Sequence, residues 1–246
     1  MTASLLAGWK LDSFTGSGIS RATYTRGHGP GVVVIHEIPG ITPKVIEFAN
    51  EVVDAGFTVV MPSLVGEPGK GPSQRYMFQS MRRICVAKEF TTWATGQSSA
   101  ITGFLRDLAR DVHEQCGGPG VGAIGMCFSG GFALGMMIDG HVTAPVLSQP
   151  SLPFAVGGRR SADLNLSAAD LEAVKQRAAE GCQVLGLRFD GDKLVGTRFD
   201  SLRRELGESF IAVEYPSRTK KDHSVVTEQR VDEGVQRVLA FFREKL

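Results

Sequence analysis

Short apolar runs alternate along the chain with longer stretches that carry apolar residues at helical spacing. The apolar runs have the length and content of buried strands, and they span residues 31–36, 57–61, 121–124, 184–189 and 209–215. The amphipathic stretches span residues 43–55, about 97–115, about 128–138, about 167–179 and 228–245. This alternation predicts an α/β fold in which a mostly parallel central sheet is flanked by helices on both faces.

Two further segments show neither pattern. Residues 63–80 are rich in Gly, Pro and Ser and are predicted to form a long loop, a feature that often has a function in compact domains. Residues 141–162 are also predicted to be irregular. No repeat, linker or composition break divides the chain, so residues 1–246 are predicted to form a single domain. Whether the loop at 63–80 moves as a lid stays open.

The charge and cysteine content narrow the function classes. The 27 basic and 26 acidic residues give a net charge of +1 without a basic stripe, which argues against nucleic acid and anionic membranes as partners. The first residues lack the pattern of a secretory signal. The cysteines show no zinc spacing, which favours a reducing, cytoplasmic setting without a bound metal; they are Cys85, Cys116, Cys127 and Cys182.

Residues 117–138 contain no charged side chain over 22 positions, which is long enough to span a bilayer. Eight of these residues are glycine, however, and Pro119 lies near the start. A strand, a tight turn and a buried helix therefore explain the segment better than a membrane span.

The same segment contains the clearest chemical motif. Gly125-Met126-Cys127-Phe128-Ser129 joins a predicted strand to a predicted helix in the form of a nucleophile elbow, with small residues two positions either side of Cys127. At the start of a helix the thiolate form of Cys127 is favoured, and the N–H of Phe128 is positioned to bind an oxyanion. Two alternatives remain. Cys127 could be a buried structural cysteine, or Ser129 could be the nucleophile, although its register lacks the glycine next to the strand.

A nucleophile of this kind needs a base and an acid from later in the chain. His223 is the candidate base because it lies between the last predicted strand and the last predicted helix, whereas His36 and His113 have structural positions. Asp190 and Asp192 both follow a predicted strand. Asp192 is preferred because it lies deeper in the loop, and Asp190 is the alternative that caps the turn.

Two more groups complete the set of candidates. Glu37 and Ile38 follow the first predicted parallel strand, at the sheet edge where ligands bind in such folds. The Ile38 N–H is a candidate second oxyanion donor, and Glu37 is either a site carboxylate or a solvated loop residue. Arg82 and Arg83 follow the long loop and are candidates for binding an anionic substrate, with a solvated surface pair as the alternative.

Four segments together resemble the dienelactone hydrolase family: HEIPG at 36–40, GMCFSGG at 125–131, FDGDKLV at 189–195 and DHSVVT at 222–227. The resemblance extends from about residue 31 to the C-terminus. It implies an α/β-hydrolase fold, no metal or organic cofactor, and a Cys-His-Asp triad of Cys127, His223 and Asp192. The family's type reaction opens the lactone ring of a dienelactone.

The resemblance also assigns supporting roles. It implies that Glu37 is the family's carboxylate, which neighbours the resting thiol and takes part in forming the thiolate. It implies that the backbone N–H groups of Ile38 and Phe128 form the oxyanion hole. The best-known members of the family follow the catalytic histidine with an arginine that helps to hold the substrate carboxylate, whereas this chain has His223-Ser224-Val225-Val226-Thr227 and no arginine there.

The expected function is therefore hydrolysis of a small carboxylic ester or lactone through an acyl-cysteine. Alternatives are an esterase or thioesterase of the same fold with an unrelated substrate, and a relative that binds a small molecule or partner without turnover. The expected state is a monomer or weak homo-oligomer.

Overall fold

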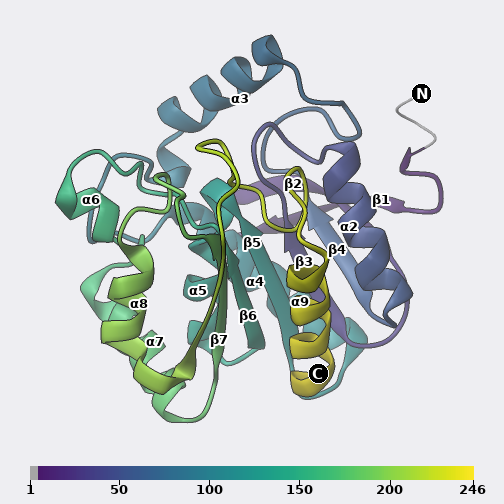
Figure 1. The fold of residues 1–246 in the computed structure, drawn as a ribbon. Coiled ribbons are helices and arrows are strands. Elements are labelled where there is room, and N and C mark those ends of the chain that lie inside the picture. The colour runs from purple at the N-terminus through teal and green to yellow at the C-terminus, as the bar shows by residue number, and fades with distance from the viewer. Residues whose placement is uncertain (1–4) are drawn as a thin grey trace.

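A computed structural model describes residues 5–246, so the first four residues of the predicted domain and of the N-terminal segment lie outside the described residues. The described chain forms an eight-stranded sheet with strand order β1-β2-β4-β3-β5-β6-β7-β8 (Figure 1). β1 and β2 form an antiparallel hairpin, β2 is antiparallel to β4, and the remaining strands are parallel. The strands are β1 Lys10–Gly16, β2 Ile19–Arg26, β3 Gly31–Ile35, β4 Thr58–Pro62, β5 Val121–Met126, β6 Val142–Ser148, β7 Val184–Phe189 and β8 Phe210–Tyr215. The predicted α/β sheet is confirmed.

Helices cover both faces of the sheet. α2 and α9 pack on one face and α4, α5, α7 and α8 on the other, as the two buried apolar clusters and Figure 1 show. The α-helices are α2 Pro43–Asp54, α3 Gln74–Val86, α4 Ala100–Cys116, α5 Phe132–Met136, α6 Gly158–Ala162, α7 Ala168–Ala179, α8 Arg198–Leu206 and α9 Asp232–Lys245. Short 3-10 helices are η1 Lys88–Phe90, η2 Cys127–Ser129, η3 Met137–Asp139 and η4 Gly207–Ser209.

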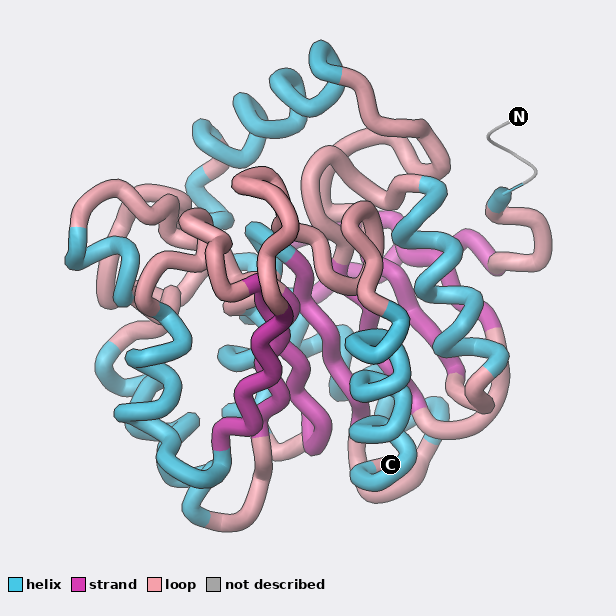
Figure 2. The backbone as a smooth tube through the Cα atoms, in the orientation of Figure 1, coloured by secondary structure: helices cyan, strands magenta, loops and turns pink. Residues whose placement is uncertain are grey.

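The residues of β3 explain why the central strands are apolar at every position. Val32 and Val34 face the cluster with α2 and α9, whereas Val33 and Ile35 face the cluster with α4 and α5, and all four are fully buried. Each side of the strand therefore contributes to a core, as expected for a parallel sheet covered on both faces. Figure 2 shows that many loops gather at one end of the sheet, below α3.

The loop predicted at 63–80 is shorter than expected, because helix α3 begins at Gln74. The hydroxyl of Ser73 accepts a hydrogen bond from the Tyr76 N–H at 3.3 Å, which caps the helix. Tyr76, Ser80 and Ile84 lie one turn apart and are buried together. Prolines and glycines before residue 73 hide this start from the sequence pattern.

The prediction that residues 141–162 are irregular is wrong, because β6 occupies Val142–Ser148 in the middle of the sheet and α6 follows at Gly158–Ala162. Pro145 lies within β6 opposite Ala123, although a proline lacks the amide hydrogen of a sheet ladder. All residues of β6 except Thr143 are buried, and this burial outweighs the missing donor.

Two other predicted helices differ in their bounds. The helix predicted near 128–138 is divided into η2, α5 and η3, and the terminal helix begins at Asp232 rather than residue 228. The hairpin β1–β2 and helix α8 were not predicted, because their residues are largely polar. The Ser167 hydroxyl accepts a hydrogen bond from the Asp170 N–H at 3.1 Å and caps the start of α7.

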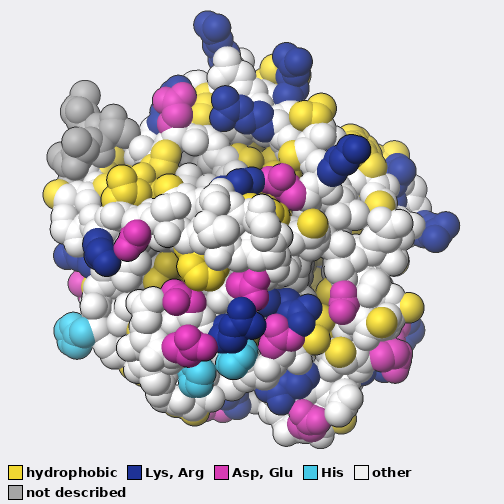
Figure 3. Space-filling view, turned by 180° about the vertical axis from the view of Figure 1, so that it is seen from behind, with side chains coloured by type: hydrophobic (Ala, Val, Ile, Leu, Met, Phe, Trp, Pro, Cys, Tyr) yellow, Lys and Arg dark blue, Asp and Glu magenta, His cyan; other side chains and the backbone are white. Residues whose placement is uncertain are grey.

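The apolar segment at 117–138 forms β5 and the short helices that follow it. Among residues 5–246, no helix combines the length and apolar character needed to cross a membrane. On the face seen in Figure 3, acidic and basic side chains are interspersed, in keeping with the net charge of +1.

Candidate active site

Cys127 is the first residue of η2 and lies at the sharp turn that follows β5. Its φ is +57°, in the left-handed region that side chains other than glycine rarely adopt. A Cβ atom at Gly125 would lie 2.1 Å from the Ser129 carbonyl oxygen, so only glycine fits there. Such a conformation costs about 1–3 kcal/mol and persists only where the surrounding structure enforces it. The backbone thus has the strained geometry that the elbow motif predicts.

Ser129 holds this turn from inside. Its side chain is fully buried, and its hydroxyl accepts a hydrogen bond from the Met126 N–H at 2.9 Å. The same oxygen lies 3.0 Å from the carbonyl oxygens of Ile35 and His36, to either of which it can donate. The hydroxyl is therefore engaged with backbone groups and does not line the pocket that contains Cys127.

The thiol of Cys127 is half-buried and lines a pocket of about 250 Å³ together with His223 and Glu37. The Ser151 hydroxyl donates to Cys127 Sγ at 3.3 Å, and the Ser151 N–H donates to the Cys127 carbonyl at 3.0 Å. Ser151 was not predicted, because it lies in the segment taken as irregular and has no motif of its own.

His223 is paired with Asp192 and not with Asp190. The distance from His223 Nδ1 to Asp192 Oδ2 is 2.6 Å, and Asp192 is 8% exposed. Asp192 Oδ1 accepts from the Leu194 N–H at 2.9 Å, which fixes the carboxylate. Asp190 is exposed and accepts from the Ser217 N–H, so it caps the turn.

The electrostatics of His223 favour its charged form. Burial by itself lowers the pKa of His223, but the charge of Cys127 and the hydrogen bond to Asp192 outweigh it and hold the pKa well above its usual value. Its Nε2 atom is buried and has no hydrogen-bond partner within the described chain. An imidazolium beside a cysteine is the arrangement that stabilises a thiolate.

Glu37 lies in the same pocket and is 3% exposed. The Ser224 hydroxyl donates to its Oε2 atom at 2.6 Å, and the Thr227 hydroxyl donates to Oε1. Burial raises the pKa of Glu37, while these two hydroxyls and the charge of His223 oppose the shift. Glu37 is thus a buried carboxyl group in the pocket that contains Cys127, and not a solvated loop residue. Thr227 was not predicted, because only the fold brings it to Glu37.

The predicted arginines lie elsewhere. Arg82 and Arg83 are exposed on α3 and line a separate hollow with Gln79 and Val86. The face of α3 that lines the Cys127 pocket carries Met77 and Met81 instead. Further apolar groups in this pocket are Ile38, Pro39, Pro72 and Leu194, and its rim carries Lys221 and Glu228.

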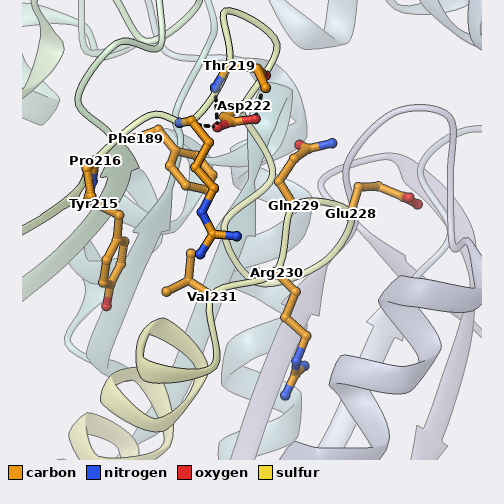
Figure 4. A pocket seen from close by; sticks show the side chains of 10 residues that line it. Phe189, Tyr215, Pro216, Thr219, Asp222, Glu228, Gln229, Arg230 and Val231 are labelled. Carbon is orange, nitrogen blue, oxygen red and sulfur yellow. Dashed lines mark hydrogen bonds between the residues drawn. The ribbon is translucent and has the colours of Figure 1, made fainter.

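A second hollow of about 570 Å³ lies beside the loop that carries His223 (Figure 4). Gln229 lines both cavities, and its side-chain oxygen accepts from the N–H groups of His223 and Ser224 at 3.2 and 2.8 Å. The larger hollow includes neither Cys127 nor His223. Residues 5–246 contain no group of three or more His, Cys, Asp or Glu side chains placed to hold a metal ion.

The mostly parallel sheet, the strained turn after β5 and the residues that converge beside it define an α/β-hydrolase. The family model of the dienelactone hydrolase family matches residues 20–153, which is more than half of the chain. The chain therefore belongs to the dienelactone hydrolase family, and it is a hydrolase that acts on ester bonds. No curated protein matches the chain in sequence.

Solved structures share the fold at low sequence identity. A candidate dienelactone hydrolase from Klebsiella pneumoniae has 18% identity and a TM-score of 0.65, with 96% of this chain and 98% of that chain covered. A dienelactone hydrolase from Anabaena variabilis has 15% identity and a TM-score of 0.65, with 97% and 98% covered. A promiscuous phosphotriesterase from metagenomic libraries, described as similar to dienelactone hydrolase, has 16% identity, a TM-score of 0.64, and 96% and 98% covered.

Proposed function

We propose that the protein hydrolyses small carboxylic esters or lactones through an acyl-cysteine intermediate, with Cys127 as nucleophile, His223 as base and Asp192 as the group that orients His223. One observation carries the proposal. Cys127 and His223 line a single pocket, and His223 is bonded to Asp192 at 2.6 Å. A strained cysteine, a raised histidine pKa and a buried carboxylate in one pocket are typical of nucleophilic catalysis.

The reaction follows from these positions. His223 Nε2 takes the thiol proton, and Cys127 Sγ attacks the carbonyl carbon of the ester. The resulting oxyanion accepts hydrogen bonds from the backbone N–H groups of Ile38 and Phe128. The tetrahedral intermediate then collapses, and His223 protonates the alkoxide as it leaves. Water, deprotonated by His223, attacks the thioester, and the acid is released as the thiol forms again.

Asp192 and Glu37 assist from either side. Asp192 accepts a hydrogen bond from the Nδ1–H of His223, so that Nε2 faces the substrate in the form that can accept a proton. Glu37, in its ionised form, stabilises the imidazolium that His223 becomes when it takes the thiol proton, and so takes part in forming the thiolate when substrate arrives. Both roles for these carboxylates are part of the proposal.

The lining of the pocket favours an uncharged substrate of modest size. Met77, Met81 and Leu194 provide apolar walls, and the volume of about 250 Å³ limits the acyl and alcohol groups together. Lys221 and Glu228 at the rim carry opposite charges. Arg82 and Arg83 line a different hollow, which removes the cations expected to bind an anionic dienelactone.

The test compares the wild type with Cys127→Ala and with wild type alkylated by iodoacetamide, on a short aryl ester and on a dienelactone. We expect both blocked samples to lose activity by about 10³-fold or more, since loss of a nucleophile removes the covalent route. Activity that survives in Cys127→Ala would contradict the proposal. Turnover of neither substrate by the wild type would favour the alternative of a binding protein. Cytoplasmic location and a monomeric or weakly oligomeric state stay predictions.

A further inference from the structure

The hydrogen bonds that the carboxyl group of Glu37 receives from the described residues all come from neutral groups. Ser224 and Thr227 provide one hydroxyl each, and Gln149 Nε2 donates to Oε2 at 3.3 Å. Within the described residues no lysine or arginine forms an ion pair with it, and His223 is the cation that acts on its charge. Burial disfavours the charged form of a carboxyl group, and three neutral partners offset this less than a cation would. This arrangement therefore calls for a functional explanation.

The three partners come from segments that the proposed reaction must keep in register. Glu37 directly precedes Ile38, whose N–H is the proposed oxyanion donor, and Ser224 directly follows the base His223. Gln149 follows β6 and is fully buried, with a φ of +37° in the left-handed region. Its Oε1 atom accepts from the Ser148 hydroxyl and from the Val225 N–H at 3.4 Å. Glu37 therefore connects the strand β3 end with the histidine loop.

We propose that Ser224 and Thr227 are positioning residues that act through Glu37: they hold its carboxyl group between the oxyanion donor at Ile38 and the base His223. This inference rests on the proposed function of the same site. It assigns a task to the two hydroxyl side chains that follow the catalytic histidine in the loop.

Hydroxyl groups suit this task because each can either donate or accept a hydrogen bond. When Glu37 is ionised, both hydroxyls donate a hydrogen bond to it. When Glu37 is protonated, one hydroxyl can rotate and accept a hydrogen bond from the carboxyl O–H. An arginine or lysine in their place could only donate and would hold Glu37 in the charged form. The hydroxyls of Ser224 and Thr227 thus keep the carboxyl group of Glu37 in place in both of its protonation states.

Two charged side chains near Glu37 act on its pKa in opposite directions. The charge of His223 lowers the pKa of Glu37, and Glu228 raises it. Cys127 and Lys221 line the same pocket, and His36 precedes Glu37 in the chain. Burial is the largest influence and raises the pKa of Glu37.

The two oxygens of Glu37 are not equivalent. Among residues 5–246, Oε2 has two donors, Ser224 and Gln149, whereas Oε1 has Thr227 alone. Removal of the Thr227 hydroxyl therefore leaves one oxygen with no partner, and removal of the Ser224 hydroxyl leaves Gln149 in place. The inference predicts a larger effect for Thr227→Val than for Ser224→Ala.

The experiment measures two pH profiles for wild type, Thr227→Val, Thr227→Ser and Ser224→Ala. One is kcat/KM for a short aryl ester, and the other is the rate at which iodoacetamide alkylates the thiols, corrected with Cys127→Ala. In Thr227→Val we expect the acidic limb of both profiles to move to higher pH by about one unit, because a lost donor to a charged group raises the pKa of Glu37. Ser224→Ala moves in the same direction by less, and Thr227→Ser restores the wild-type profile.

A matched control removes a hydroxyl that has no such role. Thr143 lies near the start of β6, away from the site, and its buried hydroxyl has no hydrogen-bond partner within the described chain. Thr143→Val should leave both profiles unchanged. Thermal melting of each variant shows which samples are folded, and Ser224→Ala serves if Thr227→Val does not fold.

Two results would overturn the inference. One is a loss of activity in Thr227→Val that is equal at every pH, which is the result of a merely structural role. The other is an effect of Ser224→Ala that exceeds that of Thr227→Val. Failure of the proposed function gives a different result, namely ester hydrolysis that does not depend on Cys127. In that case the pH profile of alkylation still tests the role of Ser224 and Thr227.

Discussion

His36 offers the most direct test of the electrostatics beneath the site. Its side chain is fully buried, and its Nε2 atom accepts from the N–H groups of Leu64 and Val65 at 3.0 and 3.4 Å. Its Nδ1 atom lies 2.8 Å from the Glu37 carbonyl oxygen, to which it donates. Both ring nitrogens are thus used in the neutral form, and a proton on Nε2 would face two N–H groups.

The size of the effect follows from the pKa of His36, which burial lowers from 6.5 to about 4. Because the folded pKa is the lower one, the unfolded chain binds the proton first as the pH falls. The stabilisation is therefore fully present above pH 6.5 and is lost between pH 6.5 and about 4. At about 1.4 kcal/mol per pH unit, this loss amounts to about 3 kcal/mol of unfolding free energy.

Two neighbouring groups act in the opposite direction, so the comparison needs a variant. The raised pKa of Glu37 makes the folded protein more stable as the pH falls through that pKa. The raised pKa of His223 gives stability that is fully present below its unfolded pKa and is lost as the pH rises. His36→Gln keeps an acceptor for the two N–H groups and removes the titration of His36 alone.

The assay is urea unfolding of wild type and His36→Gln at several pH values between 7.5 and 4.5. We expect the stability advantage of the wild type to shrink by about 1.4 kcal/mol per pH unit below pH 6.5, and to be constant above it. An advantage that does not change with pH would show that His36 titrates normally and would refute the reasoning.

Two further predictions concern the site itself. Ser129→Ala leaves the buried Met126 N–H without its acceptor and should lower the unfolding free energy, measured by urea unfolding, by about 2 kcal/mol. The folded fraction of this variant should keep its activity in the ester assay. A variant that is as stable as the wild type but inactive would instead identify Ser129 as the nucleophile. An uncharged aryl butyrate should exceed the aryl hemisuccinate by about tenfold or more in kcat/KM, since the pocket walls are apolar. The ratio of the two kcat/KM values should be the same in the double variant Arg82→Ala/Arg83→Ala. A wild-type preference for the charged ester that is lost in the double variant would contradict the expected substrate class.

The parallel part of the fold could be predicted from the sequence because its signals are local. The valines of β3 are buried on both faces, and this makes a continuous apolar run visible without knowledge of its neighbours. Helix α2 is marked by Pro43 at its first turn and by buried residues at helical spacing. Where the local signal conflicts with the fold, prediction failed: Pro145 argued against a strand that packing on both sides nevertheless stabilises.

The candidate site divides in the same way. The elbow around Cys127 has a local steric cause, the order of acid and histidine along the chain singled out His223, and the place of Asp192 deeper in its loop favoured it over Asp190. The contacts of Glu37 with Ser224 and Thr227 join residues 187 and 190 positions apart, and nothing in either segment indicates the other. Arg82 and Arg83 were considered without the helix of which they are part, and the side of that helix that lines the pocket carries Met77 and Met81.

His36 and Glu37 are consecutive and both are buried, but they differ in their hydrogen-bond partners. This difference gives the two residues different tasks, one in holding the structure and the other in the chemistry. The neutral ring of His36 holds the backbone at Leu64 and Val65, the segment that leads to α3. α3 is in turn tied to the site by Ser80, whose hydroxyl donates to the Pro39 carbonyl at 2.9 Å. A change of charge on His36 would therefore disturb the pocket wall. Glu37 has partners that can follow its proton, so a change of charge there need not move the backbone. The residue that must stay neutral supports the pocket, and the residue whose partners can follow its proton lines the same pocket as the thiol.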